Sequence, residues 1–396
     1  MGWLATRVLD RGLGLFGSEV GELEVLEDRL AELDAAFAEN PVDDTDEIAA
    51  TRAFVARLGA AGLLAHVVPK RWGGASEQLR TVSLCLVRQW LARRSGVLDS
   101  AFVMQGLGGN PITVGGSDEL RARVLPKVVA GETICAFALT EPGAGSDVAA
   151  MTTSAREQSD GTIVLDGEKC FISNAPCADS FVVFAREAEA GEGGKPRFGA
   201  FFVPGDARGL SVDPIKVIAP HPIGTVHLRG VEVPAAHRLG KPGKGLELAF
   251  GNLDVFRVSV GAAALGLADR ALLETITHLR NRVQFGKPLA TQQGLRFAVA
   301  DVASDHLAAQ LLVYRAAIAR DAGTGTPADS AVAKMFATES AQRTIDRAVQ
   351  SLGGLGVTVG QPTERLYREI RALRIYEGTT EIQKLVIARA LFDQSG

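Results

Sequence analysis

Runs typical of β-strands occur in only one stretch of this chain, and this confinement constrains the fold more than any other feature. Five short runs rich in β-branched and aromatic residues lie between residues 134 and 241: Thr162–Leu165, Phe181–Phe184, Ala200–Val203, Val226–Leu228 and Val231–Val233. Gly, Pro and Asp residues bound these runs, as is typical of strands joined by turns. We therefore expect a small antiparallel β domain in the middle of the chain.

The chain on both sides of this stretch has the periodicity of helices. Before it, apolar residues three or four positions apart mark helices over Val20–Glu39, Ala49–Ala65 and Arg80–Arg94. After Gly245, the expected helices are Asp254–Asn281, Gln292–Asp321, Ala328–Leu352 and Thr380–Phe392. Short Gly/Pro turns separate several of them, which favours antiparallel neighbours in a bundle. The expected fold class is α+β, mainly α: an N-terminal helical domain (1–133), a central small antiparallel β domain (134–241) and a C-terminal four-helix bundle (242–396).

Charge and composition exclude several classes of protein. Lys and Arg number 42 and Asp and Glu number 46, so the net charge of −4 indicates neither a nucleic acid nor an anionic membrane as a partner. The longest nearly apolar run, Val258–Ala268, has 11 residues and is too short to cross a bilayer. The first twenty residues lack the apolar core of a secretory signal.

The four cysteines include no CxxC pair, and the six histidines do not have the spacing of metal ligands. These patterns predict free thiols and no metal site, so we expect a cytoplasmic protein.

A glycine-rich segment, Ala138–Asp147, opens the predicted β domain. It is either a turn between helix and sheet with Asp147 as a local cap, or a place where backbone N–H groups approach a ligand. In the second case, Thr140 and Ser146 would add hydroxyl groups. Gly-Ala-Gly alone does not decide between the two.

A second glycine cluster, Gln350–Gly356, follows a predicted helix. It lacks the preceding strand and the spacing of a dinucleotide-binding fingerprint. A C-terminal cap explains one glycine. Three glycines in four positions exceed what a cap needs, which indicates close approach of the backbone to a ligand.

The segment Arg374–Gln383 contains a carboxylate just before a helix. Thr380 followed by Gln383 is typical of a helix N-terminus with a hydroxyl cap. Glu377 therefore either balances the helix dipole or lies in an apolar pocket as a general base.

A basic loop, Arg282–Leu289, follows another predicted helix, with Gln292 beyond it. The loop is either a solvated surface feature or a place where Arg282 holds a pyrophosphate.

Taken together, these four segments resemble the acyl-CoA dehydrogenase family along the chain from about Ala49 to Leu391. The family's best-known signature resembles Ala138–Asp147, its central loop resembles Arg282–Gln292, and its catalytic stretch resembles Ile375–Gln383. The order of these motifs within a helix–sheet–helix layout makes the match specific. The resemblance implies an oxidoreductase with FAD as its cofactor.

The resemblance also implies which residues hold FAD. Phe137, Leu139, Thr140 and Ser146 would lie against the flavin or the thioester, and Phe171-Ile172-Ser173 stands where relatives commonly carry Trp-Ile-Thr. Thr379 and Glu381 would complete the site. The diphosphate and the adenosine half would be held from a neighbouring subunit by Arg282, Phe285, Gln292, Gln350, Gly353 and Gly354. The protein is therefore expected to be a homotetramer, or at least a dimer.

The substrate residues implied by the resemblance are Ser146, Asp254, Arg257, Tyr376 and Gly378, with Asp254 and Arg257 toward the CoA nucleotide. Some relatives carry their base beside this arginine, but Phe256 occupies that position here and cannot take a proton. This leaves Glu377 as the base. Desolvation beside Ile375 and Tyr376 is expected to raise the pKa of its carboxyl group.

The expected reaction is α,β-dehydrogenation of an acyl-CoA thioester to the trans-2-enoyl thioester. Glu377 would take the α proton while the β hydrogen leaves as a hydride to flavin N5. The Glu377 N–H and a flavin ribityl hydroxyl would polarise the thioester carbonyl. An electron-transferring flavoprotein is the expected electron acceptor. Alternatives are an enzyme acting on a carrier-protein-bound acyl group, an oxygen-reactive flavin oxidase, or a catalytically silent flavin- or acyl-binding protein.

Overall fold

The computed structural model describes residues 20–39, 43, 45–188 and 194–392, and it groups the chain into two compact units. The helical unit contains helix α1 (Val20–Glu39), Thr81–Asp99 and the chain from Val255 onward. The sheet unit contains the segment between α1 and Thr81, which ends at Arg80, together with Ser100–Asp254. The division into domains 1–133, 134–241 and 242–396 remains a prediction.

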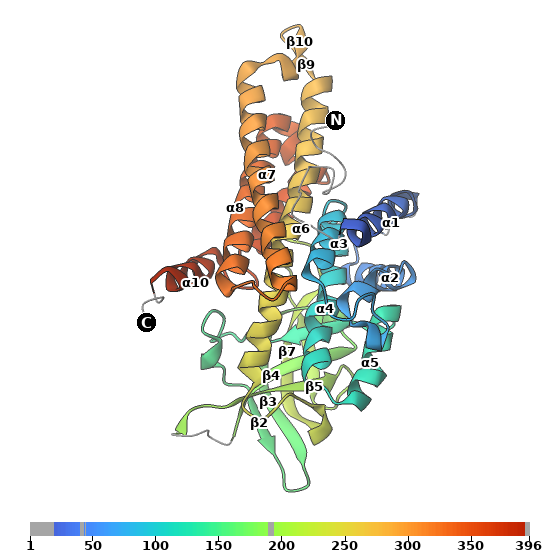
Figure 1. Ribbon diagram of the computed structural model, residues 1–396, viewed down its shortest axis with the longest axis vertical. Helices are drawn as coiled ribbons and strands as arrows, with labels where there is room; N and C mark the ends of the chain where they lie inside the picture. The colour runs from blue at the N-terminus through green and yellow to red at the C-terminus, as the bar shows by residue number, and fades with distance from the viewer. Residues whose placement is uncertain (1–19, 40–42, 44, 189–193, 393–396) are drawn as a thin grey trace. The chain divides into compact units, whose positions relative to one another are not determined.

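The sheet unit is built on one mainly antiparallel sheet (Figure 1). Its strands pair in the order β6-β7-β3-β2-β4-β5-β8, and β1 pairs with β4. The strands are β1 (Cys135–Ala138), β2 (Ser154–Glu157), β3 (Thr162–Ser173), β4 (Ser180–Glu187), β5 (Phe198–Pro204), β6 (Leu210–Pro214), β7 (Ile223–Pro234) and β8 (Arg238–Leu239). All five predicted runs lie in strands, and the last two form the single strand β7. The sequence did not predict that β1 and β2 pair with β4 in parallel, because strand direction depends on distant partners.

Residues at alternate positions of these strands form the core of the sheet unit. Ile163, Leu165, Phe181, Val183 and Phe201 are buried members of this cluster, as expected when one face of each strand is covered. Helices α2 (Glu47–Ala60), α4 (Gly96–Gly115) and α5 (Asp118–Ala130) complete the unit, although α4 begins in the helical unit. The sequence analysis did not identify α4 and α5, and α2 ends five residues before the predicted boundary.

The helical unit contains three long helices that run antiparallel, α6 (Gly245–Asn281), α7 (Gln293–Asp321) and α8 (Pro327–Leu352). A short hairpin of β9 (Val283–Gln284) and β10 (Lys287–Pro288) joins α6 to α7 (Figure 1). The unit also holds α3 (Thr81–Ala92), α9 (Pro362–Leu373) and α10 (Thr380–Phe392). All the predicted helices of the C-terminal part exist. The sequence analysis missed α9, and α6 begins nine residues before the predicted start.

Helix α6 is, in the described part of the chain, the one helix long and apolar enough to cross a membrane. The apolar run identified in the sequence thus belongs to a longer helix. However, 67% of its most apolar window is buried in the fold, as in the core helix of a globular protein. The four cysteines, Cys85, Cys135, Cys170 and Cys177, are all buried and unpaired.

Candidate active site

Strained backbone conformations coincide with the predicted site residues. The residues other than glycine that have positive φ, among those the structure describes, are Phe171 (54°), Asn174 (64°), Phe285 (54°) and Glu377 (53°). A side chain in this region costs about 1–3 kcal/mol and persists only where its surroundings hold it. Three of these four residues were assigned to the site from sequence, so the fold concentrates strain where the chemistry is expected.

In the sheet unit, the segment after β1 forms a tight turn. Glu141 and Ala144 exchange both backbone hydrogen bonds at 3.1 Å, which places Gly143 near the tip. A Cβ added at Gly143 or Gly145 would meet no atom within 4 Å. Asp147 precedes a short 3-10 turn, but its side chain accepts no capping hydrogen bond. The interpretation of Asp147 as a local cap is therefore wrong, and the open glycines favour the ligand interpretation.

A buried ion pair that the sequence analysis did not identify holds this turn in place. Lys169 Nζ lies 2.8 Å from Glu141 Oε1 and 3.0 Å from the Leu139 carbonyl oxygen. Thr152 and Thr153 also donate to the Glu141 carboxylate. Burial raises the pKa of Glu141, but these hydrogen bonds lower it well below its usual range. Glu141 is thus an ionised structural group, and its lowered pKa and hydrogen-bonded oxygens make it a poor general base.

The predicted flavin-edge residues lie at the end of β3, next to this turn. The Cys170 N–H donates to the Thr140 carbonyl at 2.9 Å, so Thr140 and Phe171–Ser173 are brought together. Phe137, Leu139 and Ile172 are buried, Thr140 and Ser173 are half-buried, and Ser146 is exposed. The Phe171 side chain is 61% exposed. An aromatic ring on a strained, exposed backbone is suited to pack against a bound aromatic group.

His221, which the sequence analysis left unassigned, contacts Ser173. Its Nδ1 lies 3.0 Å from the Ala219 carbonyl oxygen, so this nitrogen carries the proton. Its Nε2 lies 3.2 Å from Ser173 Oγ and therefore accepts from the hydroxyl. Burial lowers the pKa of His221 and keeps the ring neutral near pH 7. The hydroxyl proton of Ser173 thus points to His221, which leaves the oxygen lone pairs for another donor.

In the helical unit, Glu377 lies in the turn between α9 and α10, and its backbone is held from several sides. Arg257 Nε lies 3.2 Å from the Glu377 carbonyl oxygen. Gln383 Nε2 donates to the same oxygen at 3.3 Å and to the Gly378 carbonyl oxygen at 2.9 Å. The Glu377 N–H, in contrast, donates to no described residue. These contacts account for the positive φ of Glu377 and leave one N–H donor available.

The carboxyl group of Glu377 is desolvated but surrounded by positive charge. Its Oε2 atom is buried and makes no hydrogen bond to the described residues. Burial raises the pKa of Glu377, as predicted, while Arg88, Arg257 and Lys334 lower it in part. The prediction of an apolar pocket is therefore wrong in one respect, because three cations surround the carboxyl group.

Arg88, one of these cations, is completely buried, and the sequence analysis missed it. Its Nε and Nη2 lie 2.8 and 2.7 Å from the two carboxylate oxygens of Asp99, and its Nη1 lies 2.9 Å from Ser259 Oγ. Burial lowers the pKa of Arg88, but Asp99, together with Tyr376 and Glu377, raises it above its ordinary value, so the guanidinium stays charged. The sequence offered one signal for it, because Arg88 directly follows the apolar run Leu84–Val87.

The start of α10 differs from its expected form. The Thr379 hydroxyl, not that of Thr380, accepts from the helix, through the Ile382 N–H at 3.3 Å. Thr380 Oγ1 instead donates to Glu339 at 2.7 Å. Glu381 is exposed, and hydrogen bonds from its own backbone N–H and from Thr379 lower its pKa. Glu381 can contact an exposed ligand at the helix N-terminus, but it is not a buried base.

Two other predicted groups lie far from Glu377 along the helices. One group lies at the hairpin end of α6 and consists of Arg282, Phe285 and Gln292. At about 1.5 Å per residue, this end of α6 is about 36 Å from Arg257. Gln350, Gly353 and Gly354 lie at the end of α8, about 24 Å from Lys334 by the same measure. Since α6, α7 and α8 alternate in direction, both groups gather at one end of the bundle. Within one subunit the structure does not bring them to Glu377.

The glycines that follow α8 have different roles. Gly353 caps the helix, with φ +61° and its N–H donating to the Gln350 carbonyl. A Cβ at Gly356 would lie 2.3 Å from the Val349 carbonyl oxygen, so packing requires this glycine. A Cβ at Gly354 would meet nothing within 4 Å. Cap and packing explain two glycines, while the third leaves an open backbone.

The residues of α6 near the unit boundary differ in exposure, and their assignment to the CoA nucleotide stays a prediction. Asp254 is half-buried and Arg257 is 8% exposed. Phe256 is completely buried, so this position offers no proton acceptor.

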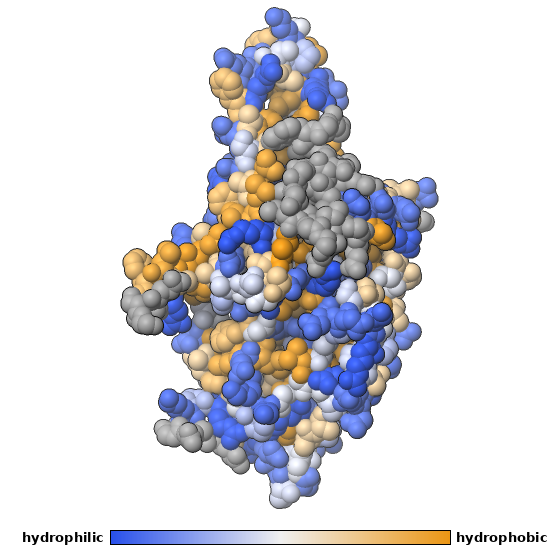
Figure 2. All heavy atoms as spheres, in the orientation of Figure 1, coloured by the Kyte–Doolittle hydropathy of each residue, from blue (hydrophilic) through white to orange (hydrophobic). Residues whose placement is uncertain are grey.

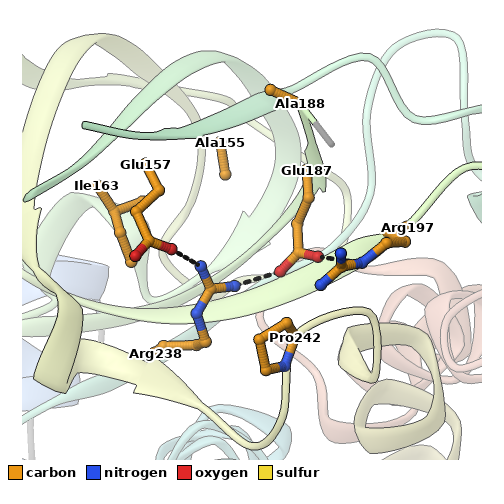
Figure 3. A pocket seen from close by; sticks show the side chains of 8 residues that line it. All are labelled: Ala155, Glu157, Ile163, Glu187, Ala188, Arg197, Arg238 and Pro242. Atoms are coloured by element: carbon orange, nitrogen blue, oxygen red, sulfur yellow. Dashed lines mark hydrogen bonds and ion pairs between the residues drawn. The ribbon is translucent and has the colours of Figure 1, made fainter. Parts of the chain in front are cut away.

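A cavity of about 110 Å³ in the sheet unit contains none of the predicted residues (Figure 3). Arg238 projects into it between Glu157 and Glu187 and pairs with both, and Arg197 pairs with Glu187 at 3.1 Å. The two arginines and two glutamates balance each other, so the cavity presents no net charge to an anionic cofactor. In the described ranges, no cluster of three or more His, Cys, Asp or Glu side chains could hold a metal ion.

The predicted cofactor residues fit an FAD. Phe171 and Phe285 present exposed rings, at 61% and 93% exposure, on strained backbones. A Cβ added at Gly143, Gly145 or Gly354 would meet none of the described residues within 4 Å, so room for a ligand is left there. Open backbone and the exposed Arg282 guanidinium provide the donors that a diphosphate requires.

Comparison with known proteins agrees with this geometry. Sequence models of the acyl-CoA dehydrogenase N-terminal, middle and C-terminal domains match residues 25–132, 136–231 and 243–392. A cyclohexane-1-carbonyl-CoA dehydrogenase from Geobacter metallireducens is 37% identical over 338 residues, covering 84% of this chain and 87% of the relative. A caffeyl-CoA reductase-Etf complex subunit from Acetobacterium woodii is 34% identical over 345 residues, covering 85% and 88%. The structure of an acyl-CoA dehydrogenase from Bacillus anthracis complexed with FAD matches with a TM-score of 0.86 and 29% identity, covering 94% of this chain and 67% of that chain. The chain therefore belongs to the acyl-CoA dehydrogenase family and is an FAD-dependent oxidoreductase.

Proposed function

We propose that this enzyme oxidises the α,β carbon–carbon bond of an acyl-CoA thioester, with Glu377 as the base. The observation that carries the proposal is the buried, unpartnered Oε2 of Glu377 on a backbone held by Arg257 and Gln383. A carboxylate that is desolvated, fixed in place and free of hydrogen bonds is suited to accept a proton from carbon.

In the proposed step, Glu377 removes the proton from the α carbon, and the electrons of that C–H bond form the new double bond. The β hydrogen leaves with its electron pair, which FAD accepts when it is bound. The Glu377 N–H, which donates to no described residue, is proposed to donate to the thioester carbonyl and make the α proton more acidic. Arg257 and Asp254 on α6 are proposed to contact the CoA nucleotide.

We further propose that the working enzyme is a homotetramer, or at least a dimer. Arg282 and Gly354 lie at the end of the bundle away from Glu377, so a flavin beside Glu377 needs them from another subunit. Apolar side chains exposed along α10 support an oligomer (Figure 2). Leu385, Leu391 and Phe392 are 64%, 71% and 79% exposed. An electron-transferring flavoprotein is the proposed acceptor, supported by the Etf complex named for the Acetobacterium woodii relative.

The test is anaerobic mixing of the purified holoenzyme with a panel of acyl-CoA thioesters that differ in chain length, branching and ring content. Loss of visible flavin absorbance, with formation of the 2-enoyl thioester, is the expected result. Acyl thioesters of a carrier protein and the reaction of the reduced enzyme with oxygen are measured in parallel. An enzyme whose flavin no thioester reduces would contradict the proposal.

A further inference from the structure

Lys334 is a buried cation that takes no part in the proposed reaction. It lies on α8 and is 0% exposed. Its buried neighbours on the same helix include Ala331, Ala333 and Ala337. In the described part of the chain no carboxylate lies within ion-pair distance of its ammonium group. Because an unpaired buried charge is costly, it needs a compensating interaction.

Among the residues that the structure describes, the Lys334 ammonium makes one hydrogen bond, and it leads to the turn that contains Glu377. Nζ donates to the Gly378 carbonyl oxygen at 2.9 Å. Gly378 follows Glu377 directly and has φ +93°, while Glu377 has φ +53°. Two consecutive left-handed residues are unfavourable when one carries a side chain, so the carbonyl contact helps to hold them.

We infer that Lys334 is a positioning residue for Glu377, which fixes the Gly378 carbonyl and provides a buried positive charge that favours the carboxylate form of the base. This inference rests on the proposed function, in which Glu377 is the base.

The charges around both groups support this assignment. Glu377 faces Arg88 on α3, Asp99 on α4, Arg257 on α6 and Lys334 on α8. Lys334 faces Glu377, Glu339, Arg257 and Arg374. Burial lowers the pKa of Lys334 to about 8, and Glu377 is the carboxylate that most opposes this change. Near pH 7, Lys334 is therefore mainly protonated, and its charge favours the carboxylate form of Glu377.

The central experiment is the pH profile of anaerobic flavin reduction in Lys334→Met, which keeps the side-chain length but removes the charge and the donor. An opposite charge nearby lowers a carboxyl pKa by about 1–3, and two arginines remain. The low-pH limb of the profile is expected to move up by about one pH unit. One pH unit below the wild-type midpoint, the rate falls about tenfold, while KM changes little.

Two further variants separate charge from structure. Lys334→Gln retains a donor but not the charge, so its low-pH limb shifts as in Lys334→Met, with a higher plateau rate. Lys127→Met, at an exposed position of α5, is the matched control and leaves the profile unchanged. Bound FAD per subunit is measured for each variant. The protonated carboxyl band of Glu377 is titrated by infrared difference against Glu377→Gln, which gives a readout besides activity.

An unshifted low-pH limb in an FAD-loaded Lys334→Met enzyme would overturn the inference. So would failure of both Lys334 variants to fold when Lys127→Met folds, because that result makes the role of Lys334 purely structural. If Glu377→Gln retains wild-type flavin reduction, the proposed base itself is wrong, and this outcome is distinguishable from the other two.

Discussion

Arg257 Nε lies 3.2 Å from the carbonyl oxygen of Glu377, so the residue proposed to contact the CoA nucleotide also holds the backbone of the proposed base. The two residues are 120 positions apart in the chain. The contact joins α6 to the turn between α9 and α10, so if both proposed roles hold, we expect substrate binding to affect the geometry of the base.

A lysine at position 257 would keep the charge but lose the planar guanidinium donors. Hydrogen bonds to charged groups contribute about 1.5–3 kcal/mol, which corresponds to roughly a 10- to 100-fold change. We expect Arg257→Lys to raise KM for the thioester and also to lower the limiting rate of flavin reduction. Stopped-flow kinetics over a range of thioester concentrations separates the two effects. A change in KM alone would show that the contact with Glu377 has no effect on the base.

Replacement of the base itself gives the largest expected loss. Glu377→Gln keeps the size and polarity of the side chain but cannot take a proton. We expect FAD and ligand binding to persist while the rate of flavin reduction falls by about 10²–10⁴-fold. Rapid-mixing absorbance measures the rate, and ligand-induced changes in the flavin spectrum report binding. Reduction at close to the wild-type rate would exclude Glu377 as the base, and Glu141 and Glu381 are poor substitutes given their lowered pKa values.

The rate of flavin reduction is expected to depend on pH with a definite sign. Burial raises the pKa of Glu377 above its ordinary value, so the inactive protonated form persists to a higher pH than for an exposed glutamate. The rate should therefore rise with pH as the carboxylate forms, with a midpoint above the usual range for glutamate. Single-turnover rates in buffers of constant ionic strength test this. A flat profile down to pH 5 would contradict the raised pKa.

The buried Glu141–Lys169 pair is expected to stabilise the turn after β1. Breaking such a pair on one side costs about 3–5 kcal/mol, so Glu141→Gln should lower the free energy of unfolding by about that amount. The folded-state pKa of Glu141 is lowered, so its stabilising effect is present above the unfolded-state pKa and is lost as pH falls through the folded-state pKa. Urea denaturation at several pH values measures both effects. The double variant Glu141→Leu/Lys169→Met is the control, and it should recover part of the stability.

Two glycines after α8 offer a matched pair of substitutions. A methyl group at Gly356 would lie 2.3 Å from the Val349 carbonyl oxygen, so Gly356→Ala should destabilise the fold by about 1–3 kcal/mol. The methyl group of Gly354→Ala would meet no atom of the described residues within 4 Å, so this variant should leave the melting temperature nearly unchanged. If Gly354 approaches the FAD of a second subunit, its alanine variant should release FAD more readily. Flavin fluorescence and thermal melts distinguish the two, and equal FAD retention in Gly354→Ala and the wild type would exclude that role.

Local sequence patterns predicted much of the fold. The apolar spacing in Val20–Glu39 and Thr380–Phe392 gives helices with those bounds, and all five predicted runs are strands. Such features depend on residues within a few positions of one another, and a single chain shows them directly. The same applies to Glu377, whose position before a helix was visible from its neighbours.

The tertiary structure decided the environment of that glutamate. Arg88, Arg257 and Lys334 come from three different helices, and no local pattern indicates that they surround one carboxyl group. The ion pair of Glu141 with Lys169 and the parallel pairing of β1 with β4 are likewise long-range. The sequence by itself determined most of the helices and strands that form and indicated the side chains proposed to carry the chemistry. Only the fold determined the charge around the base, because electrostatic interactions depend on distances in space and not on separation along the chain.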